Sequence, residues 1–346
     1  MANLQIERPM RCKRVVISRP GGPEVLQVVE EELPEPHAGE VRVKVQAAGV
    51  AVIDTMVRKG LLPFPLVPRI PFSPGMDVVG VVDKPGSEVS SLSTGQPAAA
   101  LLPRFGGYSE FVVVPEKFVL PIPGGIDPAE GVCLVLNYLT ASRLLLQAKV
   151  KQGERILVHG AAGGIGTALL ELGKEQGLEM YGTDSADKQE LVAKLGATPI
   201  DYRQVDFVAK IFELTGDGVD AVFDGIGGEN LSCSYKALGK GGRLINYGMI
   251  GPVSRGGLPR LLGSFVRLFS LRLIPDGKKV WFYGDTPAIV KKNIGWYRTT
   301  LTGLFNMLAE QKIKPIVGAR LPLVEAARAH ELLESASVTG RIVLLA

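Results

Sequence analysis

Cysteine and histidine are scarce in this chain. Its 346 residues include three cysteines, Cys12, Cys133 and Cys233, and three histidines. An odd number of widely separated cysteines excludes a disulfide framework, and it also excludes the clustered spacing of a structural zinc site.

A strong charge of either sign is also missing. The chain carries 39 basic and 35 acidic residues, a net charge of +4, and 46% of its residues are hydrophobic. This balance excludes a disordered chain and a broad nucleic-acid-binding face, so no nucleic acid partner is expected. No apolar run reaches the ~18 residues of a membrane span and the first residues lack a signal-peptide pattern, so we expect a cytoplasmic protein.

Glycine and proline, in contrast, are plentiful, with 42 and 24 residues. In the first part of the chain they separate short apolar runs, which is typical of a small antiparallel barrel. The strands predicted there are residues 15–17, 26–29, 41–45, 78–82, 98–102 and 111–114.

Near residue 127 the pattern changes to alternating helices and strands. Asp127 and Pro128 begin a predicted helix that continues to Ala148. Strands are then predicted at residues 155–159, 179–182, 198–201, 221–224, 243–247, 280–283 and 341–345. Helices are predicted at 167–176, 188–195 and 207–215, and a further helix follows the strand 280–283 and continues to about Ala309. Such alternation indicates βαβ units and a parallel sheet, and the chain length favours two domains.

The most informative segment is a glycine cluster between a predicted strand and a predicted helix. Gly160, Gly163 and Gly166 are spaced G-x-x-G-x-x-G after the apolar run 156–158. Glycines let the backbone approach a pyrophosphate, which then lies against free N–H groups at the start of the helix. The alternative is a turn that only permits close packing between helix and strand.

The end of the next strand should face the adenosine ribose, and its residues give mixed signals. Asp184 favours a free 2′-hydroxyl and hence NADH. Ser185, Lys188 and the pair Tyr202-Arg203 favour a 2′-phosphate and hence NADPH. These residues alone leave the choice open.

These motifs together resemble one family. The chain is similar to medium-chain dehydrogenases/reductases of the zinc-independent quinone oxidoreductase (zeta-crystallin-like) branch. The segments that carry the resemblance are residues 49–50, 74–80, 106–110, 139–141, 161–166, 195–197 and 241–243. The resemblance implies an α/β fold: a Rossmann-type doubly wound parallel sheet domain plus a GroES-like β-barrel domain. We expect the barrel from residues 1–126, the NADP-binding domain from 127–285, and a return to the barrel at 286–346.

The resemblance also assigns cofactor residues and favours NADPH over NADH. It places Ser185, Lys188 and Tyr202 at the 2′-phosphate, Thr140 beside the nicotinamide, and Gly248-Met249 under its ring. The full set of predicted cofactor-binding residues is Thr140, Gly163, Gly164, Ile165, Thr183, Ser185, Lys188, Tyr202, Gly248 and Met249. Some relatives bind the 2′-phosphate through an arginine where this chain has Ala336, and Arg203 or Arg341 is the candidate substitute.

No metal ligand set is predicted. Zinc-using relatives carry a cysteine where this chain has Ala51, and a Gly-His-Glu triplet where it has Gly75-Met76-Asp77. Catalytic zinc needs three protein ligands, and the cysteines and histidines here show no such spacing. His159 is expected to be a packed strand residue.

Without zinc, an electrophilic acceptor is easier to reduce than an alcohol is to oxidise. We therefore expect hydride transfer to a quinone or to an activated C=C bond (an enone or 2-enoyl group), with substrate-lining residues Asp54, Asn137 and Tyr138 as catalytic candidates. Each has a structural alternative, because Asp54 can cap a helix and the other two can anchor one. The branch also implies a homodimer through the strand from Val280 to Tyr283.

Residues 252–279 form a basic, apolar insert. They contain six basic residues and one acid, a net charge of +5, which accounts for the positive charge of the whole chain. We expect the insert to serve as a lid or an interface. Membrane contact through residues 258–273 is the alternative, which would suit a nucleotide-binding, lipid-associated protein of the vesicle-amine-transport type with little turnover.

Overall fold

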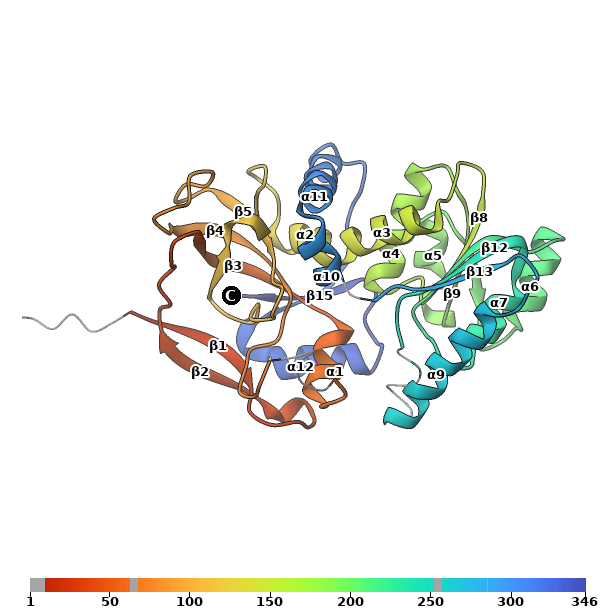
Figure 1. Cartoon of the computed structure of the whole chain (residues 1–346), viewed down its shortest axis with the longest axis horizontal. Coiled ribbons are helices and arrows are strands. Elements are labelled where there is room, and N and C mark those ends of the chain that lie inside the picture. Colours follow the sequence, from red (N-terminus) through yellow and green to blue (C-terminus); the bar gives the residue numbers. More distant parts are fainter. Residues whose placement is uncertain (1–9, 63–67, 250, 252–256, 285) are drawn as a thin grey trace, which may run out of the picture. The chain divides into compact units, whose positions relative to one another are not determined.

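The computed structural model describes residues 10–62, 68–249, 251, 257–284 and 286–346, and these divide into two compact units (Figure 1). Unit 1 is Met1–Val135, Ala319–Ser335 and Ile342–Ala346, and unit 2 is Leu136–Gly318 and Ala336–Arg341. These boundaries correct the predicted ones. The return to unit 1 begins at Ala319 rather than at residue 286, and the short segment 336–341 belongs to unit 2.

Unit 1 is the predicted barrel-type β domain. In its central strand the valines Val41, Val43 and Val45 are buried, while Lys44 between them is exposed, as expected for a strand with one face in a core. A seven-stranded sheet has the order β14-β15-β3-β4-β5-β7, with β6 paired to β3, and β1 pairs with β2 separately. The strands are β1 (Arg11–Ile17), β2 (Leu26–Glu32), β3 (Glu40–Val50), β4 (Asp77–Pro85), β5 (Pro97–Leu101), β6 (Phe111–Pro115), β7 (Val119–Pro121), β14 (Val317–Pro322) and β15 (Arg341–Leu345).

Two helices of unit 1, α1 (Val52–Arg58) and α12 (Ala326–Glu334), pack together. Arg58 at the end of α1 is fully buried and forms an ion pair with Glu334 of α12. Lys59 lies 3.1 Å from the same carboxylate. Because a buried guanidinium needs a counter-charge, this pair ties the two helices together.

Unit 2 contains the predicted parallel sheet. Its six strands have the order β10-β9-β8-β11-β12-β13, and all neighbours are parallel. The strands are β8 (Arg155–His159), β9 (Glu179–Asp184), β10 (Thr198–Asp201), β11 (Val219–Asp224), β12 (Leu238–Asn246) and β13 (Lys279–Phe282). The sheet order departs from the middle strand β8 in both directions, which is the doubly wound arrangement.

Helices connect these strands. The helices of unit 2 are α3 (Leu139–Ala148), α4 (Gly164–Glu175), α5 (Gln189–Lys194), α6 (Phe207–Thr215), α7 (Asn230–Lys236), α9 (Gly257–Arg272), α10 (Thr286–Lys292) and α11 (Ile294–Ala309). Asp206 caps α6 by accepting from the N–H of Val208 at 2.8 Å, which explains why this helix begins where the sequence predicts.

The helical run Pro128–Ala148 has an irregular centre. It consists of α2 (Pro128–Cys133), a π-helical turn (Leu134–Tyr138) and α3. The run is long and apolar enough to cross a membrane by composition, but 78% of its apolar window is buried in the protein, as in a core helix. Single π-turns occur often at functional sites, so the residues of this turn are candidates for a functional role.

Candidate cofactor site

The glycine turn after β8 is built as the sequence predicts. Gly160 adopts a positive φ of 67°, and its carbonyl accepts from the N–H of Gly163 at 3.0 Å. A Cβ on Gly166 would lie 2.2 Å from the Gly160 oxygen, which is backbone and has no room to move. Only glycine therefore lets α4 begin so close to the end of β8.

The first turn of α4 offers unpaired donors. The first bond into the helix is from the N–H of Thr167 to the carbonyl of Gly163. The N–H of Gly164 faces the carbonyl of Gly340 through a parallel bridge, whereas the N–H groups of Ile165 and Gly166 have no hydrogen-bond acceptor within the described residues. Gly163, Gly164 and Ile165 are partly exposed, so the turn is open to an anion at the positive end of a twelve-residue helix. The turn therefore fits a dinucleotide pyrophosphate.

Asp184, the acid that pointed to NADH, holds the turn in place. Its Oδ2 accepts from the N–H of Ala162 at 2.9 Å, and its Oδ1 accepts from the N–H of Ser185 at 2.9 Å. Lys188 Nζ lies 3.8 Å from Oδ1. Since both oxygens already bind groups of the protein, the carboxylate has a structural task that the sequence did not reveal.

The three residues predicted at the 2′-phosphate lie at the ends of two neighbouring strands. Ser185 and Lys188 follow β9, and Tyr202 follows β10, whose last residue, Asp201, pairs in register with Asp184. Lys188 is buried, and its Nζ donates to the carbonyl of Ala336 at 2.8 Å. Tyr202 is 50% exposed.

Arg203 and Arg341 are the two candidates to replace the 2′-phosphate arginine of relatives, and their contacts differ. The Arg203 guanidinium lies 5.8 Å from the centre of the Tyr202 ring. Arg341 instead donates to Asn137, beside α4, so of the two substitutes Arg203 is the one that lies beside Tyr202. One acid is also near, because the Ser185 hydroxyl donates to Asp187 at 2.6 Å and lowers the pKa of that carboxyl.

Thr183, a predicted cofactor residue, forms its hydrogen bonds with the glycine turn and with His159. Its carbonyl accepts from the N–H groups of Gly160 and Ala161 at 3.0 and 3.2 Å. Its buried hydroxyl lies 2.7 Å from Nδ1 of His159. Thr183 therefore fixes the glycine turn from behind.

His159 belongs to a buried network that sequence reasoning missed. Its Nε2 lies 3.0 Å from the hydroxyl of Ser234, which donates to Asp224 at 2.7 Å. Burial lowers the pKa of His159, so the ring is neutral. Because the Ser234 hydroxyl donates its hydrogen to Asp224, its oxygen accepts from Nε2 of His159, and Nδ1 accepts from the hydroxyl of Thr183. The position of His159 directly before the glycine turn was the only available signal.

The residues predicted around the nicotinamide lie on α3 and after β12, two elements that pack together. The hydroxyl of Thr140 is 2.7 Å from that of Thr286, which is 2.9 Å from the hydroxyl of Tyr283. Met249 is buried. A Cβ on Gly248 would lie 2.5 Å from the carbonyl oxygen of Gly225, so this loop needs glycine.

Of the catalytic candidates, Asp54 has a structural role. It is fully buried in unit 1, where its carboxylate accepts from the N–H groups of Ala51 and Gly75 at 2.9 and 3.0 Å. The Tyr108 hydroxyl lies 3.2 Å from Asp54 and 3.1 Å from Nε2 of His330. Burial, with the cations nearby, lowers the pKa of His330 to about 3. Asp54 thus caps α1 and ties it to the 74–76 loop.

Tyr138 and Asn137 lie in unit 2, on the π-turn. Tyr138 is buried, and its hydroxyl donates to Glu171 of α4, so Tyr138 anchors a helix rather than lining a substrate. Burial raises the pKa of Glu171. Asn137 lies beside the first residue of α4, Gly164. The structure therefore places Asn137 at the glycine turn.

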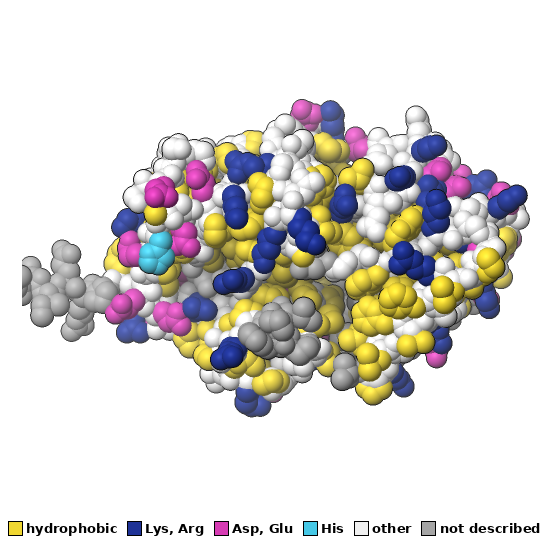
Figure 2. Space-filling model, viewed as in Figure 1, with side chains coloured by type: hydrophobic (Ala, Val, Ile, Leu, Met, Phe, Trp, Pro, Cys, Tyr) yellow, Lys and Arg dark blue, Asp and Glu magenta, His cyan; other side chains and the backbone are white. Residues whose placement is uncertain are grey.

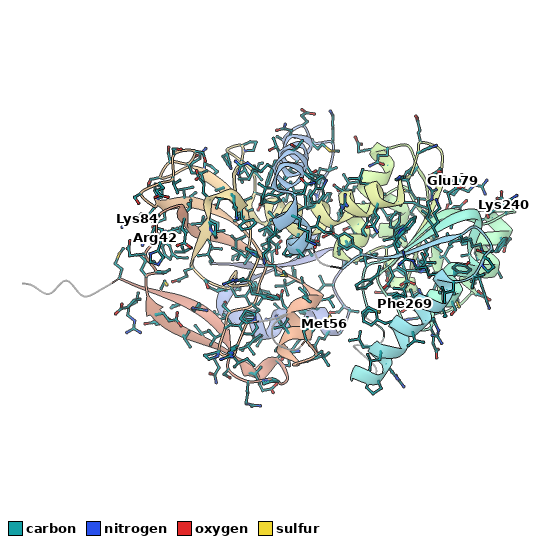
Figure 3. The ribbon with its side chains drawn as sticks, in the orientation of Figure 1. Arg42, Met56, Lys84, Glu179, Lys240 and Phe269 are labelled. Carbon is teal, nitrogen blue, oxygen red and sulfur yellow. The ribbon has the colours of Figure 1, made fainter. Side chains whose placement is uncertain are left out.

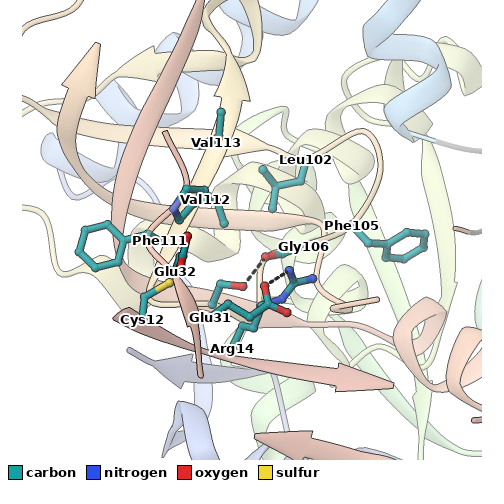
Figure 4. A pocket seen from close by; sticks show the side chains of 12 residues that line it. Cys12, Arg14, Glu31, Glu32, Leu102, Phe105, Gly106, Phe111, Val112 and Val113 are labelled. Carbon is teal, nitrogen blue, oxygen red and sulfur yellow. Dashed lines mark hydrogen bonds and ion pairs between the residues drawn. The ribbon is translucent and has the colours of Figure 1, made fainter. Parts of the chain in front are cut away.

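No group of three or more His, Cys, Asp or Glu side chains in the described part of the chain is arranged to hold a metal. A pocket of about 220 Å³ in unit 1 is lined by Cys12, Arg14, Glu31 and the 105–106 turn (Figure 4). Burial raises the pKa of the Cys12 thiol, so this cysteine is a poor nucleophile. None of the predicted site residues lines this pocket.

Comparison with known proteins agrees with this arrangement. Two family models match: the alcohol dehydrogenase GroES-like domain over residues 37–124 and the zinc-binding dehydrogenase model over residues 195–344. Quinone oxidoreductase of Mus musculus is 31% identical over 336 residues, 94% of this chain and 95% of that protein.

Two further proteins are similar over nearly the whole chain. The synaptic vesicle membrane protein VAT-1 homolog of Rattus norvegicus is 30% identical and matches 97% of this chain and 84% of that protein. The crystal structure of Escherichia coli quinone oxidoreductase complexed with NADPH has a TM-score of 0.85 and 28% identity, over 96% of this chain and 100% of that one.

Proposed function

We propose that this chain is a zinc-independent, NADPH-dependent reductase of quinones or activated C=C bonds. The chain belongs to the quinone oxidoreductase branch of the medium-chain dehydrogenase/reductase superfamily, and it is an oxidoreductase that binds a nicotinamide cofactor. One observation carries the choice of NADPH over NADH. Lys188 and Ser185 follow β9, and Tyr202 follows the neighbouring strand β10, while the competing acid Asp184 binds the backbone of the glycine turn. A 2′-phosphate would thus meet an ammonium group at this end of the sheet.

Zinc independence is supported by the residues themselves. Ala51 and Met76 occupy positions where zinc-using relatives carry ligands, and neither side chain binds zinc. Asp77, the third position, is buried at the start of β4. The acceptor must then be electrophilic without metal activation, as quinones and enones are.

In the proposed reaction, the protein holds the hydride donor and the acceptor in position. Bound NADPH would supply the hydride, and a proton from water would complete the two-electron reduction. The N–H groups at the start of α4 hold the pyrophosphate, and the loop of Gly248 and Met249 supports the ring end of the cofactor. Holding donor and acceptor in contact accounts for a large share of catalysis in such reactions.

We predict that the purified chain oxidises NADPH in the presence of 9,10-phenanthrenequinone or a small enone. Absorbance at 340 nm measures the rate, with NADH as the comparison cofactor. We expect kcat/KM with NADPH to exceed that with NADH by at least about tenfold, because one charge-assisted hydrogen bond is worth ~1.5–3 kcal/mol. No turnover with any acceptor of the panel would reject the proposed reaction.

We further propose a homodimer through β13, which is the last strand of its sheet as the structure describes it. The strand contains Val280, Trp281 and Phe282, and Phe282 is 42% exposed. An open edge of high β-propensity favours pairing with a second copy. Light scattering should give twice the 37.0 kDa chain mass. Phe282→Lys should shift the mass to that of a monomer, whereas Phe212→Lys on α6 should not. A monomeric wild type would contradict the proposal.

A second candidate function is association with an anionic membrane, and α9 favours it. Leu268 and Ser264 on one face of α9 are buried against the domain. The opposite face is apolar yet exposed (Figure 2). Its residues are Leu262, Val266 and Phe269 (labelled in Figure 3), with exposed fractions of 57, 69 and 63%, and Leu273, directly after the helix, is 82% exposed.

The surroundings of this face suit an anionic bilayer. Arg260, Arg267 and Arg272 are on the same helix, and Lys278 and Lys279 follow it. An exposed apolar stripe with cations beside it is the pattern of a helix lying at a lipid surface. A shallow groove of about 120 Å³ between α9 and β13 continues the apolar surface. Residues 252–256 of the predicted insert lie outside the described residues.

We predict that the chain sediments with vesicles containing phosphatidylserine but not with neutral vesicles. Serine at Leu262, Val266 and Phe269 should lower this binding at least about tenfold, because burying each apolar side chain is worth ~1.5–3 kcal/mol.

The matched control is serine at Val205, Phe212 and Leu214, which are also exposed in unit 2. Unchanged vesicle binding by the α9 variant would reject the membrane surface. Loss of the dimer without any effect on vesicles would instead assign α9 to a second copy of the chain.

A further inference from the structure

Asn137 lies where three features of unit 2 meet: the π-turn, the start of α4 and Arg341. Its side chain is 7% exposed. Its Oδ1 accepts from Nη1 of Arg341, a residue that is itself buried. A Cβ on Gly164 would lie 2.3 Å from the Asn137 Nδ2, so the amide nitrogen is directed at the first residue of α4.

The orientation of this amide is determined by its partner. A guanidinium has only donors, so it must face the oxygen of the amide, and the nitrogen must point the other way. In the described part of the chain, Nδ2 has no hydrogen-bond acceptor. Asn137 Nδ2 is not among the fully buried polar atoms that lack a partner, so its N–H groups are accessible and can donate to a ligand.

Several hydrogen-bond donors meet at the start of α4. The N–H groups of Ile165 and Gly166 have no acceptor within the described chain, and the Asn137 amide adds two more N–H bonds beside Gly164. Clustered donors at a positive helix end have the chemistry of an oxyanion site.

We propose that the side-chain amide of Asn137, oriented by Arg341, donates to the cofactor pyrophosphate at the start of α4. This inference rests on the proposed function and reassigns Asn137 from the substrate to the cofactor. Arg341 is a positioning residue, because it acts through Asn137.

Asn137→Asp separates this role from a structural one. The aspartate keeps the volume and the acceptor for Arg341, so a residue that only anchors Arg341 would tolerate the change. A phosphate ligand would not, because the variant replaces a donor with a negative oxygen. We expect the affinity for 2′-phospho-ADP-ribose, measured by calorimetry, to fall about 10- to 100-fold, as for a lost hydrogen bond to a charged group.

The control ligand is adenosine 2′-phosphate, which has no pyrophosphate. Asn137→Asp should leave the affinity for adenosine 2′-phosphate unchanged, whereas Lys188→Gln should lower the affinity for both ligands. Equal binding of 2′-phospho-ADP-ribose by wild type and Asn137→Asp would overturn the inference and leave the proposed function standing. A wild type that binds neither ligand would overturn both.

Arg341 is tested by a double-mutant cycle with Asn137→Leu. Arg341→Met should lower the affinity for 2′-phospho-ADP-ribose in the wild-type background. It should have little further effect on this affinity in the Asn137→Leu background. Additive losses in affinity would show that Arg341 does not act through Asn137, and would reject its positioning role.

Discussion

Gly166→Ala is expected to weaken NADPH binding severely. The new Cβ would lie 2.2 Å from the carbonyl oxygen of Gly160 and 2.7 Å from that of Ala161. Both atoms are backbone of the turn, so α4 must move away from β8 and carry its free N–H groups with it. We expect the affinity for NADPH to fall at least about 100-fold, a loss of ~2.7 kcal/mol. The free energy of unfolding should fall by ~1–3 kcal/mol, as for overpacking.

Gly303→Ala is the matched control. Gly303 lies within α11 of the same unit, and a Cβ there would meet no atom within 4 Å. Alanine in a helix should leave NADPH affinity unchanged and raise the free energy of unfolding by up to ~1 kcal/mol. If calorimetry found normal NADPH binding by Gly166→Ala, the glycine turn would not be the pyrophosphate site.

Lys188→Gln should remove most of the discrimination between NADPH and NADH. Glutamine can still donate to the carbonyl of Ala336, the acceptor of the Lys188 ammonium at 2.8 Å, so the fold should be preserved. The charge opposite a 2′-phosphate would be lost. We expect Kd for NADPH to rise about 10- to 100-fold while Kd for NADH stays within about twofold, because a hydrogen bond to a charged group is worth ~1.5–3 kcal/mol.

Lys194→Gln provides the control for this change in charge. Lys194 is an exposed residue of α5 that pairs with Glu190 at 2.8 Å. Its loss should alter neither Kd, because exposed pairs contribute little and lie in screening solvent. Parallel changes in the two dissociation constants of Lys188→Gln would indicate a structural effect and would exclude a specific 2′-phosphate contact.

The parts of the fold that the sequence predicted best are those with local signals. The strands β8, β10 and β15 and the helix α6 have the predicted bounds, because each combines an apolar pattern with a clear stop such as Gly160 or a cap such as Asp206. The glycine turn was predictable for the same reason.

Features that depend on distant contacts were not predictable. Asp184 holds the glycine turn because its carboxylate accepts from the N–H of Ala162, which lies 22 residues earlier in the chain. The residues next to Asp184 in the sequence do not indicate this hydrogen bond. Asn137 became a cofactor candidate only when Arg341, far along the chain, was seen to orient its amide. The unit boundaries likewise follow from packing, which placed α10 and α11 in unit 2.

The most direct test of this account is a crystal structure of the chain with NADPH bound. It should show the 2′-phosphate within hydrogen-bond distance of Lys188 Nζ, and the pyrophosphate against the N–H groups at the start of α4 with the Asn137 amide beside it. An Asp184 carboxylate released from Ala162 and bound to the ribose, with Lys188 still on Ala336, would contradict it.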